Sequence, residues 1–301
     1  MEIGIVILNY LNWKDTVECI DSLYKQKNQS FQIVIVDNNS HNDSIDQLKK
    51  RYKDIEKIHL LANEDNLGFA KGNNVGMLYC KTKLSIDNIL VINNDVIFTD
   101  LEYTDYLINY DFGESVGVVG TEIIGADGKN QNPRYFKLSF ISILKQYIYP
   151  LLYSLSPKIL IKIRNNLRSK NQSENTLGVK SSKPLILHGS VLFFTEKYIQ
   201  QVNGFFPETF LYYEEEILGL VCLKLGLQMQ YDPLISIYHK EDQSSELSFQ
   251  NLASVKKRFV RKSMRTGLKV SIMSQKRILR RINSVTYKTN LISKNEQITL
   301  G

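Results

Sequence analysis

The sequence has few cysteines, and they form no pattern. Cys19, Cys80 and Cys222 lie far apart, so they match neither the disulfide framework of a small secreted domain nor the spacing of a zinc site. A secretory signal is also missing, because the chain opens on the strand-like segment "IGIVIL" at 3–8 without a basic stretch before it. These absences predict a reduced, cytoplasmic setting.

Two familiar phosphate-binding patterns are missing as well. The glycines near position 70 read "NLGFAKGNNVG", which is neither the GxGxxG of a dinucleotide site nor the GxxxxGK[ST] of an NTPase loop. No uncharged run approaches the roughly 20 residues that a membrane-spanning helix needs. The sequence therefore argues against a nicotinamide enzyme, a P-loop enzyme and an integral membrane protein.

Acidic residues are absent from two long segments. Residues 247–295 contain 13 Lys and Arg and no Asp or Glu, and residues 128–173 contain nine against none. The remaining chain has 16 basic residues against all 31 acidic ones. Because both segments are also rich in aliphatic and aromatic residues, an anionic membrane surface fits them better than nucleic acid does. Packing of solvated basic helices on the acidic body stays open as the alternative.

The first part of the chain alternates short apolar runs with helical periodicity. Strands are predicted at 3–8, 32–37, 57–62 and 88–95, with a further strand at 184–194. This order predicts an α/β fold with a mostly parallel sheet and right-handed crossovers. Residues 217–227 are apolar on nearly every side, as a buried helix is, and residues 255–282 predict a basic helix. We expect a domain at 1–245, with a basic aromatic insertion at about 132–175, and a helical extension at 246–301.

Polar residues follow each of the first four predicted strands. They are Asn9 after the first strand, Asp37 to Ser40 after the second, Asn63 to Asn66 after the third, and Asn93, Asn94 and Asp95 after the fourth. Ligands of open α/β sheets bind at the carboxyl ends of the strands. Asn and Asp also make ordinary turns, but four such ends together predict one shared binding site.

Seven segments in order resemble the family 2 glycosyltransferases with a GT-A fold. They are "VILNY", "IVIVDNNSHNDS", "NLGFAKGNNVG", "VINND", "LHGSVLFF", "GFFPETFLYYEEE" and "YDPLISIYH". The resemblance covers about residues 3–240 and is strongest to the bacterial rhamnosyltransferase-like and capsule or O-antigen branch. It implies a Rossmann-like central sheet flanked by helices, here with a basic helical C-terminal extension.

The resemblance also assigns the donor side of a site. It implies that the nucleotide-sugar is bound by Asn9, Tyr10, Asp37, Asn39, Asn66, Gly68, Asn73, Asn93 and Asn94. Asp95 stands where the family has a metal-binding acid, and His239 matches a histidine that approaches the same metal, so Mn²⁺ or Mg²⁺ is the expected cofactor. One protein carboxylate suffices if the donor diphosphate supplies further oxygens to this hard cation.

The acceptor side is implied around "FLYYEEEILG" at 210–219. The resemblance makes Glu215 the general base that takes a proton from the acceptor hydroxyl. It places Gly189, Ser190, Tyr212 and Glu214 around the acceptor. Glu214 and Glu216 are also explained by the preference of carboxylates for the first turn of a helix.

The sequence thus predicts an inverting enzyme that transfers one sugar from a UDP- or dTDP-sugar to a saccharide linked to a polyprenyl diphosphate lipid. It would act in bacterial surface polysaccharide synthesis, peripherally attached to the inner face of the cell membrane and without a nucleic acid partner. The alternatives are a non-catalytic sugar-binding protein of the same fold and, less favoured, a sugar-phosphate nucleotidylyltransferase. A processive synthase is disfavoured because Trp13 is the sole tryptophan, which leaves no QxxRW motif.

Overall fold

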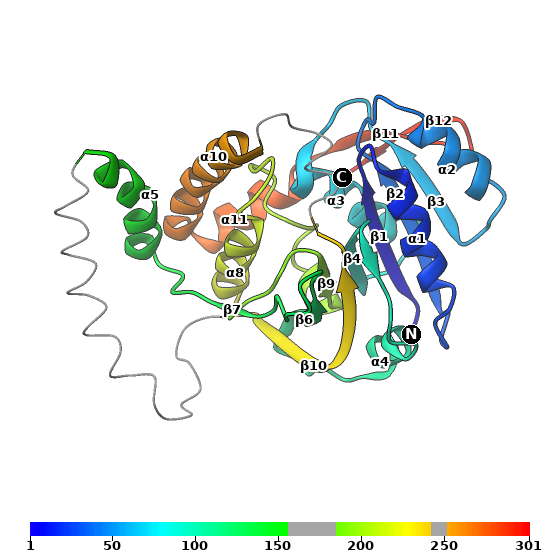
Figure 1. Cartoon of the computed structure of the whole chain (residues 1–301), viewed down its shortest axis with the longest axis horizontal. Coiled ribbons are helices and arrows are strands. Elements are labelled where there is room, and N and C mark those ends of the chain that lie inside the picture. The colour runs from blue at the N-terminus through cyan, green and yellow to red at the C-terminus, as the bar shows by residue number, and fades with distance from the viewer. Residues whose placement is uncertain (156–184, 242–251) are drawn as a thin grey trace.

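A ten-stranded sheet forms the centre of the molecule (Figure 1). The computed structural model describes residues 1–155, 185–241 and 252–301, so parts of the predicted insertion (156–175) and extension (246–251) lie outside the described residues. The strand order is β12-β11-β3-β2-β1-β4-β9-β6-β10-β5. Helices cover both faces, which confirms the predicted α/β class with a central sheet flanked by helices. Among the described residues the sheet is mixed, because four of its neighbouring strand pairs are parallel and five are antiparallel.

The first half of the chain builds the parallel part of the sheet. Its elements are β1 (Ile3–Asn9), α1 (Trp13–Leu23), β2 (Phe31–Asp37), α2 (Ser44–Tyr52), β3 (Ile58–Ala62), α3 (Gly68–Tyr79), the π-helical turn η1 (Cys80–Leu84) and β4 (Ile89–Asn93). The register pairs Asn9 with Asp37 and Asp37 with Ala62. The polar strand ends therefore lie at one edge, as the sequence predicts.

The second half extends the sheet beyond β4. It comprises β5 (Val96–Ile97), α4 (Tyr103–Asn109), β6 (Val116–Ile124), β7 (Arg134–Tyr135), α5 (Phe140–Leu155), β8 (Leu185–Ile186), β9 (Val191–Phe194), α7 (Glu196–Ile199), α8 (Glu214–Leu225) and β10 (Gln228–His239). The single strand predicted at 184–194 is in fact two strands. β8 pairs with β7 in a separate small sheet, and β9 runs antiparallel between β4 and β6. Gly189 and Ser190 lie between them.

The core consists of two layers, one on each face of the sheet. Alternate residues of β1 point to opposite faces, so Ile5 and Ile7 pack with α1, α2 and α4, whereas Val6 packs with the helices of the other face. That second layer includes residues of α3, α7, α8 and the C-terminal helices. Both faces are buried, which explains why the first strands read as continuous apolar runs.

The C-terminal part belongs to the same body as the sheet. Its helices α10 (Leu252–Ile272) and α11 (Gln275–Asn283) confirm the predicted basic helical segment. The sequence did not predict the following hairpin of β11 (Tyr287–Leu291) and β12 (Glu296–Leu300), which pairs antiparallel with β3. α10 packs against α5 and α8. Within the three described ranges, no helix combines the length and the apolar character needed to cross a membrane.

Candidate active site

A cavity of about 690 Å³ opens where the parallel strands end. Two walls enclose it. The strand-end wall consists of residues at or shortly after the ends of β1 to β4, namely Tyr10, Asn38, Asn66, Gly68, Phe69, Asn93, Asn94 and Asp95. The helix wall consists of the loop at 210–213, the start of α8, and the α10 residues Lys256, Val260 and Met264. Residues near β7, β9 and β10 close the space between them, among them Gln131, Arg134, His188, Gly189, Ser190 and His239.

The side chain of Asn38 organises the strand-end wall. Its Nδ2 donates to Asn66 Oδ1 at 2.9 Å, and its Oδ1 accepts from the backbone nitrogen of Leu67 at 3.0 Å and from Asn63 Nδ2 at 3.2 Å. Asn66 Oδ1 in turn accepts from the Gly68 nitrogen at 2.9 Å. The turn between β3 and α3 is therefore fixed to the end of β2 before any ligand binds.

Gly68 is the point where the two walls meet. Its φ is +76°, which favours glycine, and a Cβ built there would lie 2.3 Å from the carbonyl oxygen of Phe210. The next backbone nitrogen, that of Phe69, donates to the same oxygen at 2.7 Å. Only a residue without a side chain lets the turn approach the loop so closely.

Asn9 and Asp37 lie beneath this wall rather than in it. Asn9 Nδ2 donates to Asp37 Oδ2 at 2.6 Å, while the other carboxylate oxygen accepts from the Ser40 nitrogen at 2.9 Å. Thr16 Oγ1 donates to Asn9 Oδ1 at 2.7 Å. These buried contacts join the ends of β1 and β2.

The predicted donor residues thus fall into two groups. The cavity is lined by Tyr10, Asn66, Gly68, Asn93 and Asn94. It is not lined by Asn9, Asp37, Asn39 and Asn73, and Asn73 is only 1% exposed. Nucleotide-sugar binding by the second group stays a prediction. The contacts of Asn9 and Asp37 give these two residues a supporting position beneath the wall.

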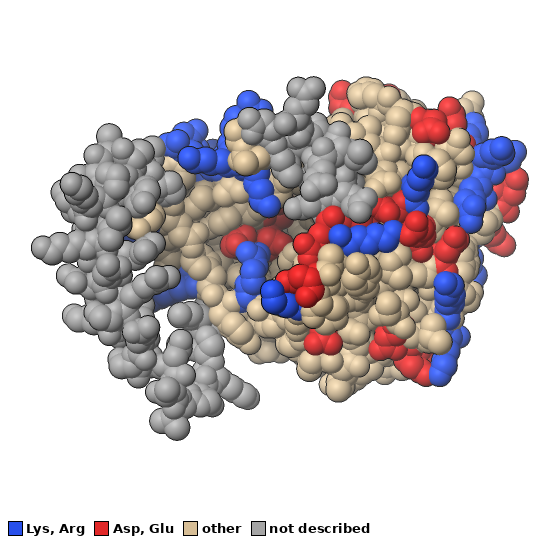
Figure 2. Space-filling view, in the orientation of Figure 1, with Lys and Arg blue, Asp and Glu red and all other residues tan. Residues whose placement is uncertain are grey.

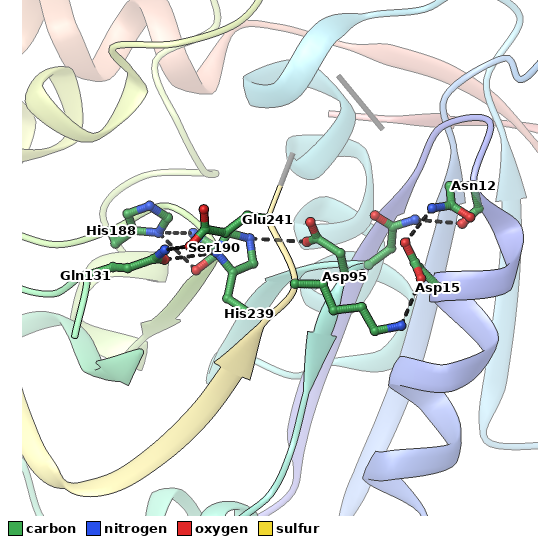
Figure 3. Close-up of polar contacts among 10 residues, drawn as sticks. Asn12, Asp15, Asp95, Gln131, His188, Ser190, His239 and Glu241 are labelled. Carbon is green, nitrogen blue, oxygen red and sulfur yellow. Dashed lines mark hydrogen bonds and ion pairs between the residues drawn. The ribbon is translucent and has the colours of Figure 1, made fainter. Parts of the chain in front are cut away.

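Asp95 and His239 face each other at the cavity floor (Figure 3). Asp95 Oδ1 lies 3.3 Å from His239 Nε2, and both side chains are over nine-tenths buried. On the far side of the ring, His239 Nδ1 lies 3.0 Å from Gln131 Oε1, and Gln131 Nε2 donates to Glu241. The imidazole is therefore held in place by its other nitrogen, an arrangement common for metal-binding histidines.

This pair fits a divalent cation that takes its other ligands from elsewhere. Neither Asp95 Oδ1 nor His239 Nε2 has a well-oriented hydrogen-bond partner among the described residues. Two adjacent ligands of an octahedral cation with bonds of about 2.1 Å lie about 3 Å apart, close to the observed separation. In the described part of the chain, however, no cluster of three or more His, Cys, Asp or Glu could hold a metal.

The neighbours of Asp95 attach this floor to α1. Asn94 Nδ2 donates to the carbonyl oxygen of Asn12 at 2.9 Å. Lys240 Nζ pairs with Asp15 Oδ1 at 2.9 Å, and the Lys240 backbone nitrogen donates to the Asp95 carbonyl at 3.1 Å. The end of β4 and the end of β10 are thus held together beside the start of α1 (Figure 3).

The three glutamates begin α8 and have different surroundings. Glu215 Oε1 accepts from the Gly189 nitrogen at 2.9 Å, and Glu215 Oε2 pairs with Arg134 Nη2 at 2.8 Å. Burial raises the pKa of Glu214 to about 8. Burial and the charge of Glu215 raise the pKa of Glu216 as well. Glu215 therefore differs from the other two, because a backbone donor and a guanidinium both contact its carboxylate.

Sequence reasoning missed several residues of the cavity. His188 lies beside His239 with ring centroids 5.5 Å apart, and its Nδ1 accepts from the Ser190 nitrogen at 3.2 Å. Burial lowers the pKa of His188, which favours the neutral ring. His188 belongs to the segment "LHGSVLFF", but the family resemblance implies no role for it. Arg134 was visible only as one cation in an acid-free segment, and no sequence signal brings Lys256 of α10 to the site.

Comparisons with known proteins address the family and the fold. The family model described as Glycosyl transferase family 2 matches residues 4–166. The chain is 27% identical over 214 residues to the dTDP-rhamnosyl transferase RfbF of Shigella flexneri, covering 71% of this chain and 61% of that one. It is 25% identical over 220 residues to the low-salt glycan biosynthesis hexosyltransferase Agl10 of Haloferax volcanii, covering 72% and 59%. The chain therefore spans less than two thirds of the length of these relatives.

Solved structures share the fold at low sequence identity. S. aureus TarS 1-349 in complex with UDP-GlcNAc superimposes with a TM-score of 0.53 at 11% identity, covering 92% of this chain and 69% of that one. The mannosyltransferase PcManGT from Pyrobaculum calidifontis, in complex with GDP-Man and Mn²⁺, gives 0.51 at 12% identity, covering 90% and 72%. The GT-A fold expected from the sequence is confirmed.

Proposed function

The chain belongs to glycosyl transferase family 2, and on this premise we propose that it is an inverting glycosyltransferase. It transfers one sugar from a UDP- or dTDP-sugar to a lipid-linked saccharide acceptor. One observation carries the proposal: Glu215 lines the same cavity as Asp95 and His239. A base for the acceptor and a candidate cation site for the donor diphosphate therefore share one space.

The reaction follows from these positions. Glu215 takes the proton of the acceptor hydroxyl as that oxygen forms its bond to the anomeric carbon of the donor. The bond from the anomeric carbon to the diphosphate oxygen breaks on the opposite face, and its electron pair leaves with the nucleotide diphosphate. The Gly189 nitrogen and Arg134 orient the Glu215 carboxylate.

The leaving diphosphate accounts for the donor end of the cavity. A bound Mn²⁺ or Mg²⁺ would neutralise the charge that develops on the leaving group. Asp95 and His239 would hold it, and the oxygens of the diphosphate would complete its coordination. Because so few protein ligands are present, we expect weak cation binding in the absence of nucleotide.

The acceptor class rests on surface chemistry and on a relative. The Shigella flexneri relative is named a dTDP-rhamnosyl transferase, which supports a dTDP-sugar donor. We extend the proposal to a role in bacterial surface polysaccharide synthesis. Phe140, Ile141 and Tyr149 are exposed on α5, beside the basic helix α10. Figure 2 shows Lys and Arg side chains over the region of α10. Apolar side chains with flanking cations suit peripheral attachment to an anionic membrane surface, here the inner face.

Replacement of the base tests the catalytic assignment. We expect Glu215→Gln to lower acceptor-dependent nucleotide release at least about 100-fold, with UDP and dTDP binding by calorimetry unchanged. The assay screens UDP- and dTDP-sugars against a bacterial lipid extract. Glu196→Gln, in the first turn of α7, is the matched control and should retain full activity. Full acceptor-dependent release by Glu215→Gln would show that Glu215 is not the base.

Nucleotide binding tests the cation site separately. Mn²⁺ or Mg²⁺ should tighten UDP or dTDP binding and raise Tm through preferential binding to the folded state. Asp95→Ala should abolish this gain, whereas Asp54→Ala, at a side chain that is 87% exposed, should keep it. If Mn²⁺ and Mg²⁺ leave the UDP and dTDP affinity of the unmodified protein unchanged, the metal assignment is wrong.

Vesicle flotation tests membrane attachment. The full chain should bind vesicles that contain phosphatidylglycerol and not vesicles of phosphatidylcholine alone. Charge reversal at exposed Lys262 and Lys269 of α10 should reduce binding, because each cation near an anionic surface contributes about 1 kcal/mol. Equal flotation with both lipids would argue against the proposal.

A further inference from the structure

One stripe of α10 faces the cavity. Lys256, Val260 and Met264 all line it, and their spacing of four residues places them on the same side of the helix. Ser263 Oγ donates to the Leu211 carbonyl at 3.4 Å, and the rings of Phe259 and Phe210 stack with centroids 5.1 Å apart. α10 therefore forms part of the cavity and holds the loop at 210–213 in place.

That loop carries strain and an unused hydrogen-bonding group. Tyr212 and Tyr213 have φ of 67° and 72°, and two consecutive bulky residues in this region cost on the order of 1–3 kcal/mol each. The Tyr212 hydroxyl is buried and has no hydrogen-bond partner among the described residues. Strained backbone beside an unpartnered donor in a cavity wall is typical of a ligand site rather than of packing alone.

The helix wall also carries a cation, Lys256, that has no acidic partner in the described part of the chain. Lys256 Nζ lies 5.0 Å from the centroid of the Tyr212 ring, and no ion pair of Lys256 occurs among the described residues. Arg134 also lines the cavity but is engaged with Glu215 and Glu216. Of the two Lys and Arg residues that line the cavity in the described part of the chain, Lys256 is therefore the one available to an anionic ligand.

We propose that the space between the loop at 210–213 and α10 binds the lipid-phosphate part of the acceptor, a phosphate attached to an isoprenoid chain. This inference rests on the proposed function and specifies the acceptor end of the same cavity. Lys256 contacts the phosphate, and the Tyr212 hydroxyl donates a hydrogen bond to it or to the adjoining sugar. Val260, Met264 and Phe210 line the path of the first isoprene units.

The cavity continues toward an apolar surface on α5. Gln146 of α5 lines the cavity, and the next residue, Tyr147, is contacted by Arg261 and Arg265 of α10 at 5.3 and 5.7 Å from its ring centroid. Phe140 and Ile141 are exposed on the same helix. A chain leaving the cavity between these helices would thus meet the surface proposed to contact the membrane.

Charge and polarity favour this ligand over others. An acidic peptide carries several carboxylates, whereas the described part of this wall offers one available cation, Lys256. A purely polar sugar phosphate would leave the apolar wall of Val260 and Met264 in contact with water or hydroxyl groups. One phosphate followed by a hydrocarbon chain matches a single available cation followed by apolar side chains.

Calorimetry with farnesyl diphosphate, in EDTA and without nucleotide, tests the site. The unmodified protein should bind this probe more tightly than it binds farnesol or inorganic diphosphate. Lys256→Ala should weaken binding about fivefold to tenfold, as expected for loss of a charge-assisted hydrogen bond. Lys257→Ala, the neighbouring exposed lysine outside the cavity, is the matched control and should change binding less than about twofold. Val260→Thr should weaken the binding of farnesyl diphosphate and leave the binding of inorganic diphosphate unchanged.

Two results would overturn the inference: equal weakening by Lys256→Ala and Lys257→Ala, or displacement of the probe by UDP in EDTA. Binding of UDP with Mn²⁺ is measured on the same proteins. Loss of UDP binding with retained Lys256-dependent probe binding would reject the donor half of the proposed function alone. Normal UDP binding without a Lys256 effect would reject the acceptor site alone. Melting curves of both exposed-lysine variants verify that they fold.

Discussion

The two walls of the cavity differ in how far their polar groups are already satisfied. In the strand-end wall, Asn38 bonds to Asn63, Asn66 and Leu67, and Asn94 bonds to Asn12. In the helix wall, the Tyr212 hydroxyl, Glu214 Oε1 and Glu216 Oε2 are buried without a hydrogen-bond partner among the described residues. In the strand-end wall, Asp95 Oδ1 at the candidate cation site shares this state, whereas its other side chains are largely preorganised.

This difference matches two different binding tasks. A wall whose side chains already bond to one another keeps its shape and loses little entropy when a ligand binds, which suits a nucleotide of constant structure. A wall with unpartnered polar groups gains its hydrogen bonds only with a ligand present. The comparison therefore predicts that substitutions in the strand-end wall mainly lower stability. Substitutions in the helix wall should mainly change ligand binding or the pH dependence of stability.

The largest effect is expected where the walls touch. Gly68→Ala places a Cβ 2.3 Å from the Phe210 carbonyl at a φ of +76°, so the turn and the loop must separate. We expect unfolding by urea to show a loss of about 3 kcal/mol or more, with loss of UDP binding. Gly128→Ala is the matched control, because its φ is +74° and nothing lies within 4 Å of its Cβ. It should lose only about 1 kcal/mol, and equal losses would show that the walls do not depend on this contact.

Asn38→Ala should have the next largest effect, and it tests the preorganised wall alone. The substitution removes the acceptor of the Leu67 nitrogen and of Asn63 Nδ2, and one of the two donors to Asn66 Oδ1. We therefore expect a loss of about 2–3 kcal/mol in urea unfolding. Asn109→Ala removes one exposed hydrogen bond to Asp105 and should cost no more than about 0.5 kcal/mol. If the loss in binding free energy for farnesyl diphosphate exceeds the loss in unfolding free energy, the two walls are not independent.

Sequence patterns identified the strand-end wall because that information is local. Each parallel strand is an apolar run, and its polar end follows directly, so adjacent residues reveal both the element and the site. The antiparallel insertion of β9 and the hairpin of β11 and β12 depend on pairings between distant segments. The hairpin is also short and partly exposed, and its residues show no apolar run that would set it apart.

The helix wall could be identified only in part for the same reason. The resemblance found Tyr212, Glu214 and Glu215, which adjoin one another in the chain. Arg134 contacts Glu215 across 81 positions, and Lys256 reaches the cavity from a helix whose basic composition suggested a surface segment. Composition gave the charge and amphipathic character of α10, but not which of its faces packs on the site.

The buried glutamate of the helix wall predicts a pH dependence of intermediate size. The pKa of Glu214 is about 8 in the folded protein against a reference of 4.5. As pH rises from about 5 to 8 the unfolded state releases this proton first, so the contribution of Glu214 to stability falls through that range and levels off above pH 8. Glu214→Gln removes the dependence, and its Tm relative to the unmodified protein should rise by about 3 °C or more between pH 5 and pH 8.

A pH series of melting curves measures this difference. Glu196→Gln, whose side chain is 46% exposed, provides the control and should show a difference in Tm that does not vary with pH. A constant difference for Glu214→Gln would mean that this carboxyl ionises in the folded protein at its ordinary pKa. Burial of Glu214 in the helix wall would then not destabilise the folded protein as pH rises.

The smallest effect on stability is expected at an ion pair outside the cavity, and it separates stability from binding. Arg281 of α11 pairs with Glu208 at 2.9 Å with side chains 47% and 30% exposed, and the Glu208 carbonyl accepts from Thr266 of α10 at 3.2 Å. Exposed pairs contribute about 0.5 kcal/mol, so Arg281→Met should change urea unfolding as little as Lys27→Met, which breaks the exposed pair with Glu102. Because Glu208 begins the loop that leads to Tyr212, only Arg281→Met should weaken farnesyl diphosphate binding, by about twofold to fivefold. Identical binding by both variants would show that α10 and α11 hold this loop without help from the ion pair, and that its strained tyrosines are fixed by packing alone.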